Sequence, residues 1–251
     1  MDEVADMKGT AQVADALQGR GLLQSADEWE ARNATLAQTI CDLIRTHQPP
    51  RSENALDVGS ADASLTDRLT QLTALRWCAT DPDIKEKAVS PCGVELIPAY
   101  GHRMPFADVS FDVVTFINVF EHVSPEWRAD TISEFKRVLR PGGILVGQLP
   151  NPYFPIESHS RLPFFGWVPR PLQPLYWRLS PTGWDFETSH FFTVTIRDLR
   201  EIAEKAGFST VIIRNFNYPV DAIPKAVRSL AVLHSWLGIV PWSWQFVFQK
   251  R

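Results

Sequence analysis

The feature that most constrains this chain is residues 55–65, which read as a buried strand, a tight turn and the first turn of a helix. Apolar residues dominate as far as Val58, small residues follow, and leucines then recur at helical spacing. Such a turn leaves backbone N–H groups free at a helix N-terminus, where they favour an anionic group. The Asp57 carboxylate can accept hydrogen bonds from an ammonium group. This stretch therefore predicts a site for the zwitterionic end of an amino acid rather than for a pyrophosphate.

The turn carries one of the three glycines that are usual in nucleotide-binding turns. Gly59 is present, while Ala61 and Ala63 stand at the other two small positions. A second predicted strand, residues 75–80, ends at Asp81. One strand–helix unit beyond such a turn, a carboxylate can bind both hydroxyls of a ribose. Asp81 is therefore predicted to bind the ribose of a nucleoside.

Strands and helices continue to alternate along the chain. Further strands are predicted at residues 94–97, 111–117, 144–149, 211–216 and 244–249, and further helices at residues 25–48, 124–140, 195–206 and 227–237. Alternation of this kind is typical of an α/β fold with a Rossmann-like, doubly wound, mostly parallel sheet. We predict seven strands, with the last two forming an antiparallel edge hairpin. Ligands then bind at the carboxyl ends of the strands.

Local signals predict where two of the helices begin and end. Ser124, followed by proline, is the expected N-cap of one helix, which residues 141–143 (Pro-Gly-Gly) should stop. Thr195 is the expected N-cap of another helix, with Asp198 facing back in a capping box. Gly207 should end that helix.

Two segments stand outside the alternation. Residues 1–50 are predicted to be an N-terminal helical cap, lying over the nucleotide-type site or simply covering the sheet. Residues 152–189 are rich in aromatic residues and proline, have little periodicity, and are predicted to be an insert that lines an apolar ligand pocket as a lid. The alternatives are weak contact with a membrane surface through its arginines, or packing on its own core.

Composition excludes several other classes. The formal net charge is -4, which does not favour nonspecific binding to nucleic acid. Three cysteines are scattered without the spacing of a metal site, as expected in a reducing, cytoplasmic compartment. We expect neither a signal peptide in the polar first twenty residues nor a membrane span, because no apolar run is long enough.

Six features in order give the chain a family resemblance. They are residues 56–59, Asp81, residues 104–114 (MPFADVSFDVV), residues 118–123 (NVFEHV), residues 137–143 (RVLRPGG) and residues 190–193 (HFFT). Over residues 55–207 the chain resembles the class I methyltransferases that depend on S-adenosylmethionine. Within them it is similar to the small-molecule branch that includes quinol O-methyltransferases. The resemblance implies a methyltransferase domain over residues 51–251 that converts S-adenosylmethionine to S-adenosylhomocysteine.

The resemblance also implies how that cofactor is held. Asp57, Gly59 and Ala61 would face its methionine end and Asp81 its ribose. The full set of implied cofactor-binding residues is Asp57, Gly59, Ser60, Ala61, Asp81, Pro82, Gly101, His102, Met104, Asn118 and Val119. Gly101, His102 and Met104 would hold the adenine, and Asn118 would lie beside the cofactor.

Besides the alanines at positions 61 and 63, two departures from the family pattern change what is expected. Tyr100 stands where relatives often place an acid for the adenine amino group, which indicates stacking instead. Quinol methyltransferases carry acids and a histidine around Glu121 and His122, and resemblance to them would imply Mg²⁺. Asn118 replaces the first of those acids here, so we predict no metal.

Methyl transfer from a sulfonium needs an aligned nucleophile, a dry site and often a base. His122, just after the fourth strand, is the first candidate base, and the alternative is a structural role. His190 is the second candidate catalytic residue, and the alternative is that it orders its loop. The insert supplies the candidate substrate residues, which are Tyr153, Phe154, His159 and Trp184.

The predicted function is transfer of a methyl group to an oxygen, with nitrogen as the alternative, of an apolar or aromatic small molecule. A second hypothesis is a non-catalytic scaffold or partner subunit that binds S-adenosylmethionine. A third, an NAD-type dehydrogenase, is disfavoured because Ser64 stands where that fingerprint requires its last glycine.

Overall fold

The structure is a computed structural model that describes residues 26–157, 159–180, 186, 191–219 and 240–251. The chain forms two compact units, and each is described by itself. The larger unit contains Ala37–Pro152, His190–Phe216 and Ser243–Arg251. The smaller unit contains Met1–Leu36, Tyr153–Ser189 and Asn217–Trp242.

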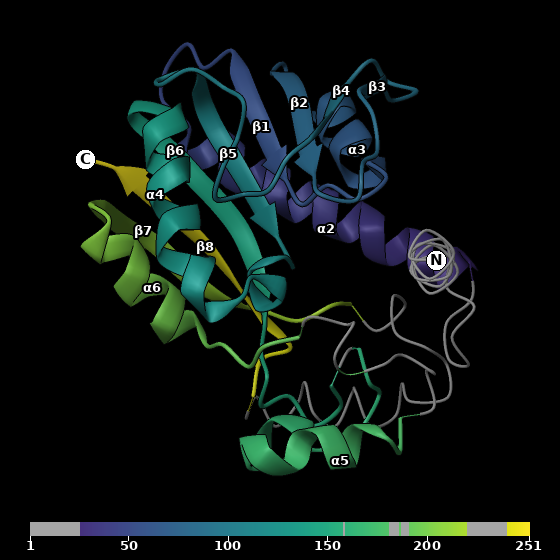
Figure 1. The fold of residues 1–251 in the computed structure, drawn as a ribbon. Helices are drawn as coiled ribbons and strands as arrows, with labels where there is room; N and C mark the ends of the chain where they lie inside the picture. Colours follow the sequence, from purple (N-terminus) through teal and green to yellow (C-terminus); the bar gives the residue numbers. More distant parts are fainter. Residues whose placement is uncertain (1–25, 158, 181–185, 187–190, 220–239) are drawn as a thin grey trace. The chain divides into compact units, whose positions relative to one another are not determined.

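The larger unit is built on one eight-stranded sheet, in the order β3-β4-β2-β1-β5-β6-β8-β7 (Figure 1). Its strands are β1 (Asn54–Val58), β2 (Arg76–Asp81), β3 (Ala88–Val89), β4 (Glu95–Pro98), β5 (Phe111–Ile117), β6 (Leu139–Pro150), β7 (Phe208–Phe216) and β8 (Ser243–Lys250). Strands β4, β2, β1, β5 and β6 run parallel, whereas β8 is antiparallel to both β6 and β7. The Rossmann-like fold class and the antiparallel edge are confirmed.

One strand more than predicted is present. The additional strand, β3, has only two residues, both exposed, and pairs antiparallel with β4 at the sheet edge. So short and exposed a strand leaves no periodic apolar pattern, so the sequence could not indicate it. By contrast, all seven residues of β5 are buried, as its continuous apolar pattern predicts for a central parallel strand.

Helices cover both faces of the sheet (Figure 1). On one face α4 (Arg128–Val138) and α6 (Ile196–Lys205) lie side by side. On the other lies the part of α2 (Ala26–His47) that belongs to the larger unit, next to α3 (Ser64–Leu72). Cys41 and Arg45 on α2 both donate hydrogen bonds to the Leu72 carbonyl, at 3.4 and 2.5 Å, and so join the two helices.

The capping box of α6 is confirmed. The Asp198 N–H donates to Thr195 Oγ1 at 3.3 Å, and the Thr195 N–H donates to Asp198 Oδ2 at 2.9 Å. Gly207 follows the helix with a φ of 95°, in the left-handed region that glycine adopts without strain. Both ends of this helix were therefore readable from the sequence.

The predicted boundaries of α4 are wrong at both ends. Ser124 makes no side-chain capping bond, because the chain first forms a 3₁₀ turn, η2 (Pro125–Trp127), and α4 begins at Arg128. The helix ends at Val138, before the expected Pro-Gly-Gly stop. Residues 141–143 instead lie inside β6, where the pairing with β5 shifts register between Phe111 and Val113. Pairing with the sheet thus overrides the helical pattern.

The smaller unit has little regular structure among its described residues. It holds the short helices η3 (Phe165–Trp167), η4 (Arg170–Leu172) and α5 (Gln173–Trp177). Phe165 and Trp177 are buried and pack edge to face with their ring centroids 5.3 Å apart. The insert therefore has an aromatic core of its own. The helix predicted at residues 227–237 lies outside the described residues.

Candidate functional site

Three of the predicted polar residues lie at the carboxyl ends of neighbouring strands. Asp57 lies in β1, Asp81 ends β2, and Asn118 directly follows β5. Because β1 pairs with both β2 and β5, the sheet topology brings these residues to one edge. This is the edge at which open α/β sheets bind their ligands.

The turn after β1 requires glycine at position 59. Gly59 has a φ of 77°, and a Cβ built on it would lie 2.4 Å from Cγ2 of Val119. A methyl group there would meet the side chain that packs over the turn, in addition to adopting a strained backbone conformation. Gly59 and Val119, both predicted cofactor residues, are therefore in direct contact.

The expectation of free backbone N–H groups in this turn is wrong. The Ala63 and Ser64 N–H groups are bonded within the turn, and three more are bonded to the end of β2. The Gly59 and Ser60 N–H groups donate to the Thr80 carbonyl, at 2.7 and 3.2 Å. The Ala61 N–H donates to Asp81 Oδ2 at 2.8 Å. These bonds join the turn to the end of β2, so the three donors stabilise the fold and are already paired within the protein. The sequence could not show this, because the partners belong to the neighbouring strand.

A side chain at the same turn does keep hydrogen-bonding capacity. Ser60 is 8% exposed, and its hydroxyl has no hydrogen-bond partner within the described residues. The hydroxyl of Thr80, fully buried in β2, is in the same state over the part of the chain that the structure describes. A buried hydroxyl without a partner is costly, and a polar ligand would relieve that cost. This observation favours Ser60 over the backbone as a ligand donor.

Asp57 is buried and held by two threonines. Its carboxylate accepts the Thr66 hydroxyl at 2.5 Å and the Thr115 hydroxyl at 2.7 Å. Burial raises the pKa of Asp57, and the two threonine hydrogen bonds only partly oppose that rise. Each carboxylate oxygen keeps a second lone pair, so the geometry still allows an ammonium group as a further partner.

Asp81 has both a structural and a candidate binding role. Its carboxylate accepts the Ala61 N–H and, at 2.9 Å, the Asp83 N–H. Burial raises the pKa of Asp81, while these two backbone bonds lower it. One acceptor position remains on each oxygen, which matches the two hydroxyls of a ribose. Pro82, also a predicted site residue, is exposed next to it.

The loop after β4 presents a ladder of aromatic rings. His102 stacks on Trp127 with the ring centroids 4.4 Å apart, and on Tyr100 with the centroids 5.5 Å apart. Tyr100 and Trp127 are exposed. Gly101 fits tightly, since a Cβ there would lie 3.3 Å from Val58 and Thr131. The ladder offers a planar ligand an aromatic face, in keeping with the stacking expected of Tyr100.

Met104 differs from the other residues predicted to hold adenine. Its side chain is buried, and its N–H donates to Glu134 Oε1 at 2.8 Å. Arg137 binds Glu134, Asp108 and the carbonyls of Met104 and Phe106 through one guanidinium group. The Glu134 hydrogen bond raises the pKa of Arg137, which stays charged. Arg137 thus fixes the loop on α4, a role that its place in a motif did not reveal.

Asn118 belongs to a hydrogen-bond network, built around the buried Gln148 and Gln245, that the sequence did not indicate. Asn118 has a φ of 56°, and its Oδ1 accepts the Gln148 side chain at 3.2 Å. Gln148 Oε1 accepts the Gln245 amide at 3.1 Å, and Gln245 Oε1 accepts Arg214 at 2.7 Å. The network crosses β6, β8 and β7, which are far apart in sequence. It fixes the side-chain orientation of Asn118.

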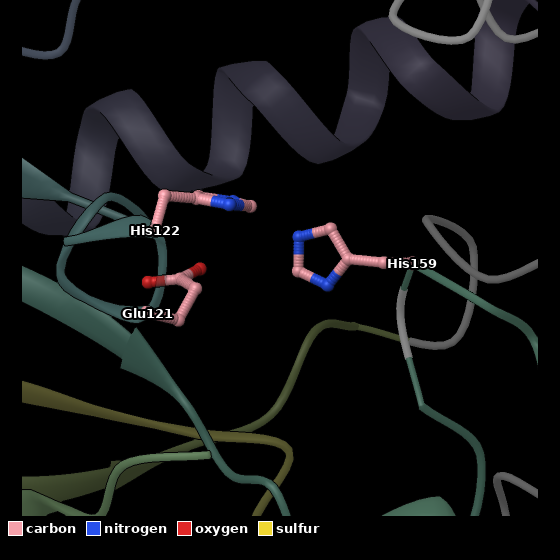
Figure 2. Close-up of side chains that lie close together, drawn as sticks. All are labelled: Glu121, His122 and His159. Atoms are coloured by element: carbon pink, nitrogen blue, oxygen red, sulfur yellow. The ribbon is translucent and has the colours of Figure 1, made fainter. Parts of the chain in front are cut away.

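The candidate base lies in the short turn η1 (Phe120–His122) that follows β5 (Figure 2). Figure 2 shows the side chains of Glu121 and His122 leaving this turn. Glu121 is buried, and a carboxylate oxygen of Glu121 and a ring nitrogen of His122 lie within 4.8 Å. The Phe192 N–H donates to the Glu121 carbonyl at 2.8 Å, which ties residues 191–192 to this turn.

The candidate substrate residues belong to the smaller unit. Tyr153 packs on Trp167, and Phe154 stacks on Trp242 with the ring centroids 4.7 Å apart. His159 Nδ1 lies 2.7 Å from Oε1 of the buried Glu157. Glu157 also accepts the backbone N–H groups of His159 and Ser160. Trp184 and His190 lie outside the described residues.

Comparison with known proteins shows a similarity to methyltransferases over part of the chain. Residues 56–147 match the family model described as a methyltransferase domain. A Mycobacterium sp. (strain KMS) protein named an uncharacterized methyltransferase is 34% identical over 124 residues, covering 48% of this chain and 46% of the relative. Residues 56–147 are thus similar to a methyltransferase domain, in keeping with the resemblance predicted from the sequence. The chain spans about half the length of the curated relatives it matches.

Two further similarities bear on the predicted resemblance. The demethylmenaquinone methyltransferase of Staphylococcus aureus (strain JH9) is 29% identical over 144 residues, 55% of this chain and 57% of that protein. The Burkholderia thailandensis 1,6-didemethyltoxoflavin-N1-methyltransferase, solved with 1,6-didemethyltoxoflavin and S-adenosylhomocysteine, has a TM-score of 0.58 at 14% identity, covering 99% of this chain and 89% of that chain. The structural likeness confirms the fold, and the similarity to the demethylmenaquinone methyltransferase supports part of the finer resemblance.

The matched segment covers all eleven candidate cofactor residues. It runs from β1 into β6 and includes Asp57, Asp81 and Asn118. The candidate substrate residues lie beyond it. Among the helices that the structure describes, none is both long enough and apolar enough to cross a bilayer.

Proposed function

We propose that this chain transfers a methyl group from S-adenosylmethionine to an oxygen of an apolar or aromatic small molecule, with nitrogen as the alternative acceptor. The observation that carries the proposal is the placement of Asp57, Asp81 and the Gly59 turn at one sheet edge, inside the segment that matches the methyltransferase family. Among the similar proteins, one is named for methylating a demethylmenaquinone and another was solved with S-adenosylhomocysteine. Both relatives support this substrate class.

Each part of the cofactor has a proposed partner in the domain. Asp57 and the Ser60 hydroxyl would hold the methionine end, and Asp81 the ribose through its remaining lone pairs. The exposed ring of Tyr100 would stack on the adenine, supported by His102. The wider proposed set remains Gly59, Ala61, Pro82, Gly101, Met104, Asn118 and Val119.

When bound, S-adenosylmethionine supplies an electrophilic methyl group on a sulfonium. A ring nitrogen of His122 would accept the hydroxyl proton of the acceptor while its oxygen forms the new bond to carbon. The electron pair of the broken sulfur–carbon bond stays on sulfur, so the charges balance with His122 protonated. We propose that no metal takes part, so chelation of divalent cations should leave the rate unchanged.

The insert is the proposed lid over the acceptor. Tyr153, Phe154, His159 and Trp184 would contact the acceptor, and His190 remains the second candidate for proton transfer. Amide exchange across residues 152–189 should slow when S-adenosylhomocysteine and acceptor are added together. Protection equal to that of the central strands in the empty protein would favour a permanently packed segment instead.

Replacement of the ribose acid tests the proposal. Asp81→Ala removes two charged hydrogen-bond acceptors, so S-adenosylhomocysteine should bind at least about tenfold more weakly by calorimetry. Asp83→Ala is the matched control, because it removes an exposed acid from the same turn. Equal affinity in both variants would remove Asp81 from the site.

Methyl release from labelled S-adenosylmethionine to a panel of phenols, quinols and amines then separates enzyme from scaffold. Cofactor binding without transfer to any acceptor would favour the non-catalytic alternative. Binding of NAD in place of S-adenosylhomocysteine would favour a dehydrogenase.

A further inference from the structure

Large apolar side chains are exposed along one short segment of the smaller unit. Trp167 is 63% exposed, Leu175 63% and Leu179 70%, and Phe164 and Leu172 are exposed as well. Single exposed apolar residues are ordinary, but five within residues 164–179 are not. The segment therefore presents an apolar surface to its surroundings.

This exposure does not come from a segment that fails to fold. Leu162, Phe165, Gln173 and Trp177 from the same stretch are buried. Phe165 and Trp177 form the aromatic core, and the Gln173 side chain donates to the Val168 carbonyl at 3.0 Å. The segment thus buries one set of side chains completely and keeps a second apolar set outside.

Three of the exposed residues share one helical face. Leu172, Leu175 and Leu179 follow one another at spacings of three and four residues along η4, α5 and the turn after it. That turn continues the helix, since the Leu179 N–H donates to the Tyr176 carbonyl at 3.0 Å. An exposed apolar stripe of this kind is suited to contact with an apolar surface outside the segment.

The charge of the same stretch indicates what that partner is. Residues 158–184 contain Arg161, Arg170 and Arg178 and not one of the 29 acidic residues of the chain. Arg170 and Arg178, which are close in sequence to Leu172 and Leu179, are exposed. Arginine, tryptophan and leucine together on one surface suit the headgroup region of a bilayer with anionic lipids.

We propose that residues 164–179 dock the protein on the surface of an anionic membrane. The exposed leucines and Trp167 would enter the boundary between headgroups and acyl chains, while Arg170 and Arg178 contact lipid phosphates. A second copy of this chain is a poorer partner. A symmetric contact would bring the arginines of both copies together, and the stretch has no acid to offset them. The proposal does not depend on methyl transfer.

Flotation of the full chain with lipid vesicles tests the proposal. The protein should float with vesicles of phosphatidylcholine containing about one third phosphatidylglycerol, and less with phosphatidylcholine alone or at high salt. Leu175→Glu should weaken binding roughly tenfold or more, because it replaces an inserted side chain by a charge. Val89→Glu is the matched control, since Val89 is 67% exposed on β3 of the larger unit, and it should bind as the natural protein does.

Charge removal provides the second arm. Arg170→Gln with Arg178→Gln should weaken binding to the anionic vesicles by about fivefold for each arginine. Arg51→Gln with Arg200→Gln removes the same charge from exposed positions elsewhere and should have little effect. The proposal is overturned if the natural protein does not float at low salt, or if the paired variants bind equally. It is also overturned if Leu175→Glu instead converts a dimer to a monomer in light scattering.

Discussion

The two units of this protein are stabilised in different ways. In the larger unit, strands paired along their whole length enclose an aliphatic and phenylalanine core that includes Leu56, Val114 and Phe135. In the smaller unit, short helices are held by ring contacts and by side chains that bind the backbone. Many backbone hydrogen bonds stabilise the larger unit, whereas a few side-chain contacts stabilise the smaller unit.

Glu157 illustrates the difference. Its carboxylate accepts the His159 ring nitrogen and the backbone N–H groups of His159 and Ser160. Glu157 thereby supplies hydrogen-bond acceptors to the backbone of one loop, as a neighbouring strand does for the backbone of β5. Single substitutions should therefore act locally in the smaller unit. In the larger unit they should act on the whole sheet and on the strand ends that form the candidate site.

The largest expected effect is on turnover, and it tests which of the two units contains the catalytic base. His122→Ala in the larger unit should lower turnover by roughly 10²–10⁴-fold, the usual worth of a positioned base, and leave S-adenosylhomocysteine affinity nearly intact. The loss should shrink as pH rises, because a deprotonated hydroxyl needs no base. His159→Ala in the smaller unit should mainly raise the KM for the acceptor. Natural turnover in His122→Ala at neutral pH would contradict the role and make His190 the next residue to test.

The next effect concerns the turn that the sheet holds. Gly59→Ala should reduce the free energy of unfolding of the larger unit by about 3 kcal/mol, because its Cβ would meet Val119 and its φ is 77°. Gly93→Ala, with a φ of 84° and no atom within 4 Å of its Cβ, should cost only about 1 kcal/mol. Amide exchange in β5 measures both. Equal losses would mean that backbone strain alone matters at the turn.

A smaller effect is expected from Glu157. Burial by itself would raise its pKa, but the His159 charge and the surrounding hydrogen bonds outweigh burial and lower the pKa to about 2, from an ordinary 4.5. A lowered pKa stabilises the fold above about pH 4.5, and this stability is lost as the pH falls toward 2. Glu157→Gln should therefore cost about 2 kcal/mol at neutral pH and flatten the acid dependence.

Exchange of amides in residues 159–180 against pH would follow that loss, with Glu86→Gln, an exposed acid, as the control. The same acid dependence in Glu157→Gln as in the natural protein would show that another group holds the loop.

The smallest effect is a gain. Ala61 has a φ of 49°, so Ala61→Gly should relieve left-handed strain and stabilise the larger unit by roughly 0.5–1 kcal/mol. Ala129→Gly, at an exposed position in α4, should instead destabilise by about 1 kcal/mol. Thermal unfolding measures both, and a loss in Ala61→Gly would show that the alanine methyl group is needed there.

The sequence by itself determined the fold class and the candidate cofactor residues. Three signals were local: the continuous apolar pattern of β5, the capping box at Thr195 and the strand–turn–helix around Gly59. A local signal can be interpreted without knowing which other element of the fold packs against the segment. Asp57 and Asp81 were readable for the same reason, since each stands at the end of a recognisable strand.

Only the tertiary structure decided what those residues contact. Neighbouring elements supply the partners of the Gly59 and Ser60 N–H groups. The same holds for the five hydrogen bonds of Arg137 to four residues and for the amide network from Asn118 to Arg214. The end of α4 was likewise decided by pairing of Leu139 with β5 rather than by the Pro-Gly-Gly signal. The physical reason is that a hydrogen bond depends on distance in space, and the chain reveals that distance only once its strands are ordered.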